Sequence, residues 1–478
     1  MEKSIIKNAI FNTINKGIQI LFPLITTSYI SRVLGPIGVG EISSVQNLTT
    51  YFTIFAALGI PSYGVRVISQ TKKNQKLCNK TFTELFIINT ISTLVCILLY
   101  FYILNMTYNI YNCTLALIFS SLIFFNFANI EWLYQGFEEY RYITIRSIFI
   151  KLLSLIFLFL LVKDEEDIVW YAVIICFGIG GNYILNLINL KKYVQLSFKD
   201  LSLNEHFSPI IIFFMSVIAI EIYSLLDITM LTVFVSKESV GYYTNATKIV
   251  KMVSGVLTSF AAVLLPRFSY YFSERNYKKI GELSRKFLNI TILVGLPSSL
   301  GIFLLADQIV TILFGSLFSP VVLIIKILTP LIIFMPLSGG VFCQILLTSG
   351  REKLYFYSVG IGAVINAILN IILISKFMHN GAAIASVISE ILVSLMMIIF
   401  SYKIVKIQFS IKEFSKIIIS GLIMALVIFY ISKIRYIKFP ILLLILEVIS
   451  GIIIYFFLLW RLKSKIMYEI VDKLLKKN

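Results

Sequence analysis

Apolar residues along this chain gather into stretches about as long as a membrane is thick, and short polar segments separate them. A helix needs roughly 20 largely apolar residues to cross the hydrocarbon core. Fourteen segments meet this requirement: 10–31, 42–63, 82–104, 113–134, 147–162, 168–190, 208–234, 241–265, 287–306, 321–348, 355–375, 381–402, 416–432 and 439–460. The pattern therefore predicts an all-α integral membrane protein of about 14 transmembrane helices. Because the number is even, both termini are expected on one side.

The charges between these segments predict the orientation. Cytoplasmic loops of membrane proteins carry an excess of Lys and Arg. If the termini are cytoplasmic, most Lys and Arg fall on the inner side, and the outer loops keep only Arg32, Lys163, Lys237, Lys376, Lys433, Arg435 and Lys438. The outer loop 163–167 is net acidic. We therefore expect a multi-pass protein of the bacterial cytoplasmic membrane with both termini in the cytoplasm.

Composition narrows the class further. Apolar residues make up 58% of the chain and charged residues 14%, whereas about a quarter of the residues of a soluble protein are charged. The net charge of +18 follows from the loop bias, so no nucleic-acid partner is expected. Two histidines and five scattered cysteines without a CxxC motif predict neither a structural metal nor a disulfide framework.

The loops are too short for a catalytic or nucleotide-binding domain, and the chain has no GxxxxGK[ST] phosphate loop. We therefore expect a protein that is not an enzyme and has no cofactor. Its energy source would be an Na⁺ or H⁺ gradient, the membrane potential or the substrate gradient, and the sequence leaves these open.

An internal repeat divides the chain. Val39-Gly40 opens the second predicted helix as Val240-Gly241 opens the eighth. Both helices end in a proline followed by an arginine, Pro61 with Arg66 and Pro266 with Arg267. Six helices separate the copies, so both run in the same direction. A parallel repeat predicts two six-helix lobes, 1–200 and 201–405, with the substrate between them; helices 13 and 14 and a cytoplasmic tail then occupy 406–478.

Polar residues inside the eighth predicted helix form one stripe. The stripe consists of Thr244, Lys248, Lys251, Gly255 and Thr258. If the helix begins near Gly241, Lys251 lies about 15 Å deep, and two cations on one face would suit a pyrophosphate, which needs several donors. If the span is instead 249–270, both lysines lie at the outer interface. Both readings stay open at this point.

Two other helices carry candidate polar groups. In the first, Asn8, Asn12, Asn15 and Gln19 share a face beside Lys16, which indicates either a wet cavity wall or interhelical hydrogen bonds. In the seventh, Glu221 or Asp227 could bind a coupling proton or Na⁺. Alternatively, these carboxylates compensate the charge of Lys248 or Lys251.

Five segments carry a resemblance to a known family. They are SRVLGPIGVGEISSVQNLTTYF (31–52), LGIPSYGVRVIS (58–69), EWLYQGFEEYRYITIRS (131–147), VGYYTNATKIVKM (240–252) and ILLTSGREK (345–353). In this order the sequence resembles the polysaccharide repeat-unit flippases of the multidrug/oligosaccharidyl-lipid/polysaccharide exporter superfamily. Helices 13 and 14 are additional to the twelve-helix core of that family.

The resemblance implies two lobes that open alternately to the two sides of the membrane. It implies transport of undecaprenyl-pyrophosphate-linked oligosaccharides for capsule or O-antigen, or of teichoic-acid precursors. In related flippases, cavity cations of helices 1, 2 and 8 bind the pyrophosphate. The matching positions here are Lys16, Arg66, Lys248 and Lys251. No arginine lies within helix 2, where Asn47 takes the corresponding place, and Asn12 completes the predicted substrate-binding set.

Other functions compete with this one. An exporter of drugs or metabolites from the same superfamily would use an acidic cavity, which helix 7 offers. A membrane polymerase or ligase would need a sizeable outer loop, which the sequence lacks. A non-transporting assembly component also stays open. The expected partners are a lipid-linked oligosaccharide, membrane lipids and the polysaccharide polymerase machinery.

Overall fold

The computed structural model describes residues 5–262, 264–407, 410–433 and 440–468. Side chains are described from Phe22 onward, except at 216, 219, 220, 222, 223 and 262. Throughout these ranges the regular structure is helical, without a β-strand. The prediction of an all-α protein is confirmed.

Eleven segments of the described chain are long and apolar enough to cross a membrane. Two of them, 22–71 and 352–402, have 50 and 51 residues, and at roughly 20 residues per crossing each is long enough for two passages. α8 (Asn204–Phe234) is helical over the predicted span 208–234. The multi-span architecture is confirmed, and the number of fourteen stays a prediction.

The helices group into two compact units, Met1–Gly241 and Tyr242–Asn478. α8 belongs to the first unit because it packs against α1 (Ile5–Ala57) and α2 (Ile60–Thr71). α9 (Lys237–Ala262) begins in the first unit and continues into the second. The lobe boundaries after residues 200 and 405 rest on the sequence repeat and stay predictions.

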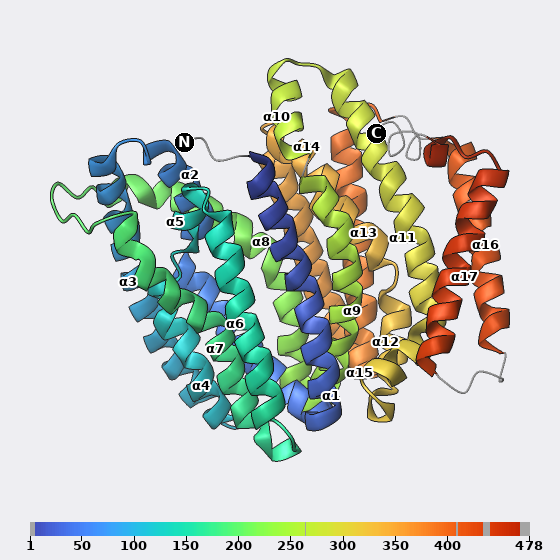
Figure 1. Cartoon of the computed structure of the whole chain (residues 1–478), viewed down its shortest axis with the longest axis horizontal. Helices are drawn as coiled ribbons and strands as arrows, with labels where there is room; N and C mark the ends of the chain where they lie inside the picture. Colours follow the sequence, from blue (N-terminus) through green and yellow to red (C-terminus); the bar gives the residue numbers. More distant parts are fainter. Residues whose placement is uncertain (1–4, 263, 408–409, 434–439, 469–478) are drawn as a thin grey trace. The chain divides into compact units, whose positions relative to one another are not determined.

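The first unit is a helix bundle in which α3, α4, α6 and α7 pack beside α1 (Figure 1). Its remaining elements are α3 (Gln75–Met106), α4 (Cys113–Phe124), η1 (Phe125–Ala128), α5 (Glu131–Gly136), α6 (Tyr140–Leu161), η2 (Glu165–Asp167), α7 (Ile168–Asn189) and η3 (Leu190–Lys192). Buried apolar side chains form two clusters, one around Phe119 and Tyr100 and the other around Phe82 and Tyr134.

α1 contains two of the predicted spans, 10–31 and 42–63, joined through Gly35. Gly35 has φ +64°, a conformation that a residue with a Cβ adopts only with strain. Pro36 follows and removes one backbone donor from the helix. The second span ends at Ala57 rather than 63, because Leu58 and Gly59 both have positive φ.

The glycines of the internal repeat lie against each other. A Cβ built on Gly40 would lie 1.6 Å from the backbone oxygen of Lys237, and one on Gly241 would lie 2.1 Å from the backbone oxygen of Pro36. Each built Cβ is also near the other glycine's nitrogen, at 3.1 and 3.2 Å. α1 and the start of α9 therefore cross in backbone contact, which only residues without a side chain permit.

The second unit contains the rest of α9 and the helices that follow it. These are α10 (Leu265–Ser273), α11 (Tyr277–Leu313), η4 (Ser316–Phe318), α12 (Val321–Leu328), α13 (Leu331–Pro336), η5 (Leu337–Phe342), α14 (Cys343–Thr348), α15 (Glu352–Tyr402), α16 (Ile411–Ser432) and α17 (Pro440–Arg461). α15 contains two predicted spans and changes direction at Met378, which has φ 50°.

The predicted continuous helix 321–348 is wrong in detail. It consists of α12, α13, one π-helical turn and α14. Pro330 and Pro336 interrupt the hydrogen-bond ladder, and Gly340 leaves helical geometry at φ −105° and ψ −112°. Apolar length alone could not show these interruptions.

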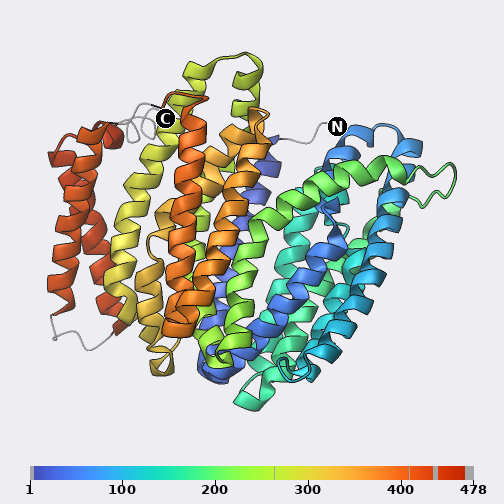
Figure 2. The ribbon, with the colours of Figure 1, turned by 180° about the vertical axis from the view of Figure 1, so that it is seen from behind.

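α16 and α17 form a hairpin that packs against α11, seen in red beside the yellow helix in Figure 2. Glu413 joins the beginning of α16 to the residues that follow the end of α17. Its carboxylate accepts hydrogen bonds from Lys416 Nζ at 2.7 Å, Ser464 Oγ at 3.0 Å and the Lys465 backbone nitrogen at 2.9 Å.

Candidate functional site

The predicted polar stripe is present on α9. Lys248, Lys251 and Gly255 are exposed, Thr258 is half-buried and Thr244 is buried. α9 begins at Lys237, so Lys248 and Lys251 lie about 16 and 21 Å along its axis at a rise of 1.5 Å per residue. The helix thus starts earlier than the predicted 241. The depth of the two lysines in a membrane stays a prediction.

Other faces of α9 are buried within its unit, which leaves Lys248 and Lys251 on the exposed side. Ser254, Leu257 and Ala261 are buried, and Ser254 Oγ lies 3.6 Å from Met335 Sδ of α13. α9 is therefore amphipathic, with an apolar face packed inside its unit and a cationic face left exposed.

Two of the other predicted binding residues, Arg66 and Asn47, lie in the first unit and differ in how exposed their side chains are. Arg66 is exposed on α2, a short helix whose Ile60, Tyr63 and Ile68 are buried. Asn47 is 4% exposed, and its Nδ2 donates to the Leu225 oxygen at 3.1 Å and to Thr229 Oγ1 at 2.8 Å. Asn47 thus joins α1 to α8, and its role in binding substrate stays a prediction.

The acidic candidates also differ. Asp227 is 2% exposed within α8, whereas Glu221, nearly two turns earlier, is exposed. A buried carboxylate in a membrane helix needs a partner or a proton, which makes Asp227 the stronger candidate of the two. Lys16 and Asn12 lie in α1, but their side chains are outside the described part of the chain.

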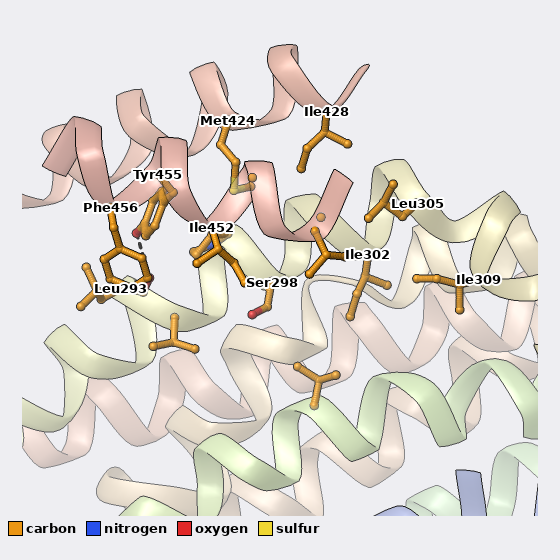
Figure 3. Close-up of a pocket in the computed structure, with 16 residues that line it drawn as sticks. Leu293, Ser298, Ile302, Leu305, Ile309, Met424, Ile428, Ile452, Tyr455 and Phe456 are labelled. Atoms are coloured by element: carbon orange, nitrogen blue, oxygen red, sulfur yellow. Dashed lines mark hydrogen bonds between the residues drawn. The ribbon is translucent and has the colours of Figure 1, made fainter. Parts of the chain in front are cut away.

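An apolar pocket of about 390 Å³ lies in the second unit, between α11 and the α16–α17 hairpin (Figure 3). Apart from the hydroxyls of Ser298 and Tyr455 its lining is apolar, with Ile302, Met424 and Ile452 among the contributors. Tyr455 OH donates to the Leu293 oxygen at 2.8 Å and is thereby satisfied. Ile452 is 52% exposed, so the pocket reaches the outer surface of the unit.

Val253 of α9 contributes to this pocket. Since it follows Lys251 by two residues, it lies about 200° around the helix. One helix therefore presents cations on one face and a wall of an apolar pocket on the other. Such a unit could bind the headgroup and the chain of one amphipathic anion separately. The pocket cannot be predicted from the sequence, because its lining comes from four helices that are distant in the chain.

No group of three His, Cys, Asp or Glu side chains suited to a metal occurs among the described residues. The described candidate groups are cationic, amide and carboxylate side chains.

A family model described as "Polysaccharide biosynthesis protein" matches residues 5–272, more than half of the chain. This chain belongs to the polysaccharide biosynthesis protein family. A second model, MatE, matches residues 212–372. The resemblance inferred from the sequence segments is confirmed.

Two relatives match most of this chain and a third matches less than half of it. A protein of Escherichia coli (strain K12), provisionally named an O-antigen transporter, is 25% identical over 415 residues, 83% of this chain and 96% of its own length. A Shigella dysenteriae protein of the same name is 23% identical and covers 82% of this chain and 98% of its own length. A Haloferax volcanii protein, provisionally named a low-salt glycan biosynthesis flippase, is 26% identical over 42% of this chain and 43% of its own.

Solved structures share the fold of this family member. The lipid II flippase MurJ in an inward closed conformation matches with a TM-score of 0.78 at 19% identity, covering 97% of this chain and 100% of its own. An inward-facing multidrug-resistance MATE transporter of the MOP superfamily matches with 0.60 at 14% identity, covering 83% of this chain and 97% of its own. At these identities the matches show the fold.

Proposed function

We propose that this protein is a flippase that carries an undecaprenyl-pyrophosphate-linked oligosaccharide across the bacterial cytoplasmic membrane by alternating access. The main support for this proposal is that α9 has two exposed lysines on one face and contributes to the wall of an apolar pocket on another. Family membership and relatives named as O-antigen transporters and a glycan flippase support it.

The lysines would bind the pyrophosphate. A hydrogen bond to a charged group contributes about 1.5–3 kcal/mol, and two cations three residues apart can reach both phosphates at once. The apolar pocket would hold part of the isoprenoid chain, because the chain can pass from lipid into an apolar pocket without burying unpaired polar groups of the wall. Asn47, Arg66, Lys16 and Asn12 remain further proposed contacts.

Binding of two purified lipids tests the assignment. Lys248→Gln with Lys251→Gln should weaken the binding of undecaprenyl pyrophosphate at least about tenfold, since 1.4 kcal/mol corresponds to a factor of ten. Binding of uncharged undecaprenol should not change. Native mass spectrometry of the full-length protein in detergent measures both.

A matched control uses lysines away from α9. Lys278 and Lys279 are exposed at the start of α11, so their double Gln variant removes the same charge from another place. Unchanged pyrophosphate binding in the Lys248/Lys251 variant, or an equal loss in the control, would contradict the proposal.

The proposal includes an orientation with both termini cytoplasmic, as the loop charges indicate, and a polysaccharide polymerase as an acceptor of the flipped product. Asp227 is the proposed coupling or compensating carboxylate because it is buried. Labelling of single cysteines with a membrane-impermeant maleimide in intact cells tests the orientation: a cysteine near residue 165 should react, and one near residue 279 should not.

A further inference from the structure

A second, polar pocket lies within the first unit. It has a volume of about 410 Å³ and is lined from α5, α6 and α7, with Pro61 of α2 closing one side. Figure 1 shows these three helices together in the first unit. Much of its lining comes from the segment 131–147, one of the five that carry the family resemblance, and the proposed function assigns this segment no role.

Arg146 holds one wall of this pocket. It is 4% exposed, and its guanidinium donates to Asn182 Oδ1 at 3.0 Å, to Asn186 Oδ1 and to Glu131 Oε2 at 2.5 Å. All three nitrogens are thereby engaged, and Glu131 offsets the charge. Arg146 is consequently a positioning residue, and its charge is not left over to attract an anion.

Several polar groups of the wall keep unused bonding capacity. The Glu131 side chain is 36% exposed, and its Oε1 accepts one bond, from Gln135 Nε2 at 3.2 Å. Gln135, Asn129 and Asn182 are half-buried in the lining. The carboxylate accepts hydrogen bonds, and the neighbouring amides both accept and donate them.

Trp132 supplies an independent indication of a ligand. Its side chain is 2% exposed and lines the pocket, yet its Nε1 has no hydrogen-bond partner among the described residues. A buried indole N–H usually finds an acceptor, and a buried donor left without one destabilises the fold. An acceptor supplied by a ligand would remove that penalty.

We propose that this pocket binds sugar rings, namely the saccharide part of the lipid-linked substrate. Sugar hydroxyls donate and accept at once, so they can donate to the carboxylate and form both kinds of bond with the amides of the wall. The ring of Tyr183, which is half-buried in the lining, offers surface to the apolar face of a pyranose. Among the charged lining residues, Glu131 would repel a phosphate and offsets the charge of Arg146, while Lys151 adds an ammonium group that can donate to sugar hydroxyls as well as to a phosphate. The volume far exceeds the roughly 30 Å³ of one water, so a single cation would leave most of it empty.

The inference rests on the proposed function. The side of the membrane that the pocket is expected to face also agrees with that function. The charges around Arg141 and Arg146 predict that this end of the helices faces the cytoplasm. A substrate assembled in the cytoplasm would present its sugars to that side first. The pyrophosphate and the sugars would then bind at different places, the former at α9 and the latter among α5, α6 and α7.

A printed array of free mono- and oligosaccharides, incubated with the labelled full-length protein, tests this assignment. The wild type should retain at least one saccharide. Gln135→Ala and Trp132→Phe should each weaken that binding about three- to tenfold, as expected for one neutral hydrogen bond. Gln70→Ala is the matched control, because Gln70 is exposed on α2 and does not line the pocket.

Undecaprenyl pyrophosphate without sugar separates this inference from the proposed function. Gln135→Ala should bind it as the wild type does, and the Lys248/Lys251 variant should retain saccharide binding. No saccharide retained by the wild type, or equal retention by both pocket variants, overturns the sugar site. If the Lys248/Lys251 variant binds undecaprenyl pyrophosphate as the wild type does, while the saccharide results are as expected, the flippase assignment is overturned and the sugar site is not.

Discussion

The contact between Gly40 and Gly241 gives a sharp prediction about stability. Ordinary van der Waals contact begins near 3.4 Å, and the Cβ of an alanine at position 40 would lie 1.6 Å from the Lys237 oxygen. Because that oxygen is backbone, no side chain can move aside. α1 and α9 must therefore separate by about 1.8 Å at the crossing. Overpacking of this kind costs about 1–3 kcal/mol.

Gly40→Ala should accordingly lower the folded-to-unfolded ratio roughly 5- to 150-fold. The midpoint of unfolding in a titration of dodecyl maltoside micelles with sodium dodecyl sulfate measures this. Gly180→Ala is the control in the same unit, since a Cβ at Gly180 has no neighbour within 4 Å. It should leave stability unchanged or raise it by up to about 1 kcal/mol, because alanine favours helix.

A double-mutant cycle sharpens the test. Gly241→Ala should destabilise by a similar amount, because its Cβ would lie 2.1 Å from the Pro36 oxygen. One separation of the helices accommodates both methyl groups, so the double variant should lose less than the sum of the single losses. Strict additivity, or a neutral Gly40→Ala, would refute a shared backbone contact.

Three further substitutions test other parts of the fold. Glu413→Gln removes the ion pair with Lys416 and should destabilise the α16–α17 hairpin by about 1–3 kcal/mol, seen as faster amide exchange confined to 411–468. Gly59→Ala should lower the thermal midpoint, because φ is +84° and the Cβ would meet the Phe214 nitrogen at 2.5 Å; unchanged melting would argue against that geometry. Ile302→Trp should fill the apolar pocket and reduce undecaprenol binding in native mass spectra, whereas Ile453→Trp, on an exposed site of α17 outside the lining, should not.

The length of the apolar segments was sufficient to predict the class of fold, because bilayer thickness sets the length of every membrane crossing. It could not predict every place where a helix breaks. The interruption at Gly340 depends on local backbone geometry and packing against Ala261 and Phe287, which apolar length does not record. At Gly35 the sequence did predict a break, because the predicted spans 10–31 and 42–63 lie on either side of this residue, where the structure has a kink with φ +64°.

The candidate site was predictable only where one helix carries it. Lys248 and Lys251 share a face through helical spacing, and the structure places both on the exposed side of α9. Asn47 illustrates the limit, because its amide nitrogen is used by Leu225 and Thr229 from a helix nearly two hundred residues away. Both pockets depend on such long-range neighbours, so neither was visible in the sequence.

The glycine crossing also bears on how such a chain can evolve. Gly40 and Gly241 are equivalent positions of the repeat that the sequence predicts, and each lies in the other's contact surface. A side chain gained at either glycine would therefore push both helices apart. Selection at these two positions is consequently joint, and paired sequence change across the halves should be rarer there than at neighbouring positions such as Val39 and Val240.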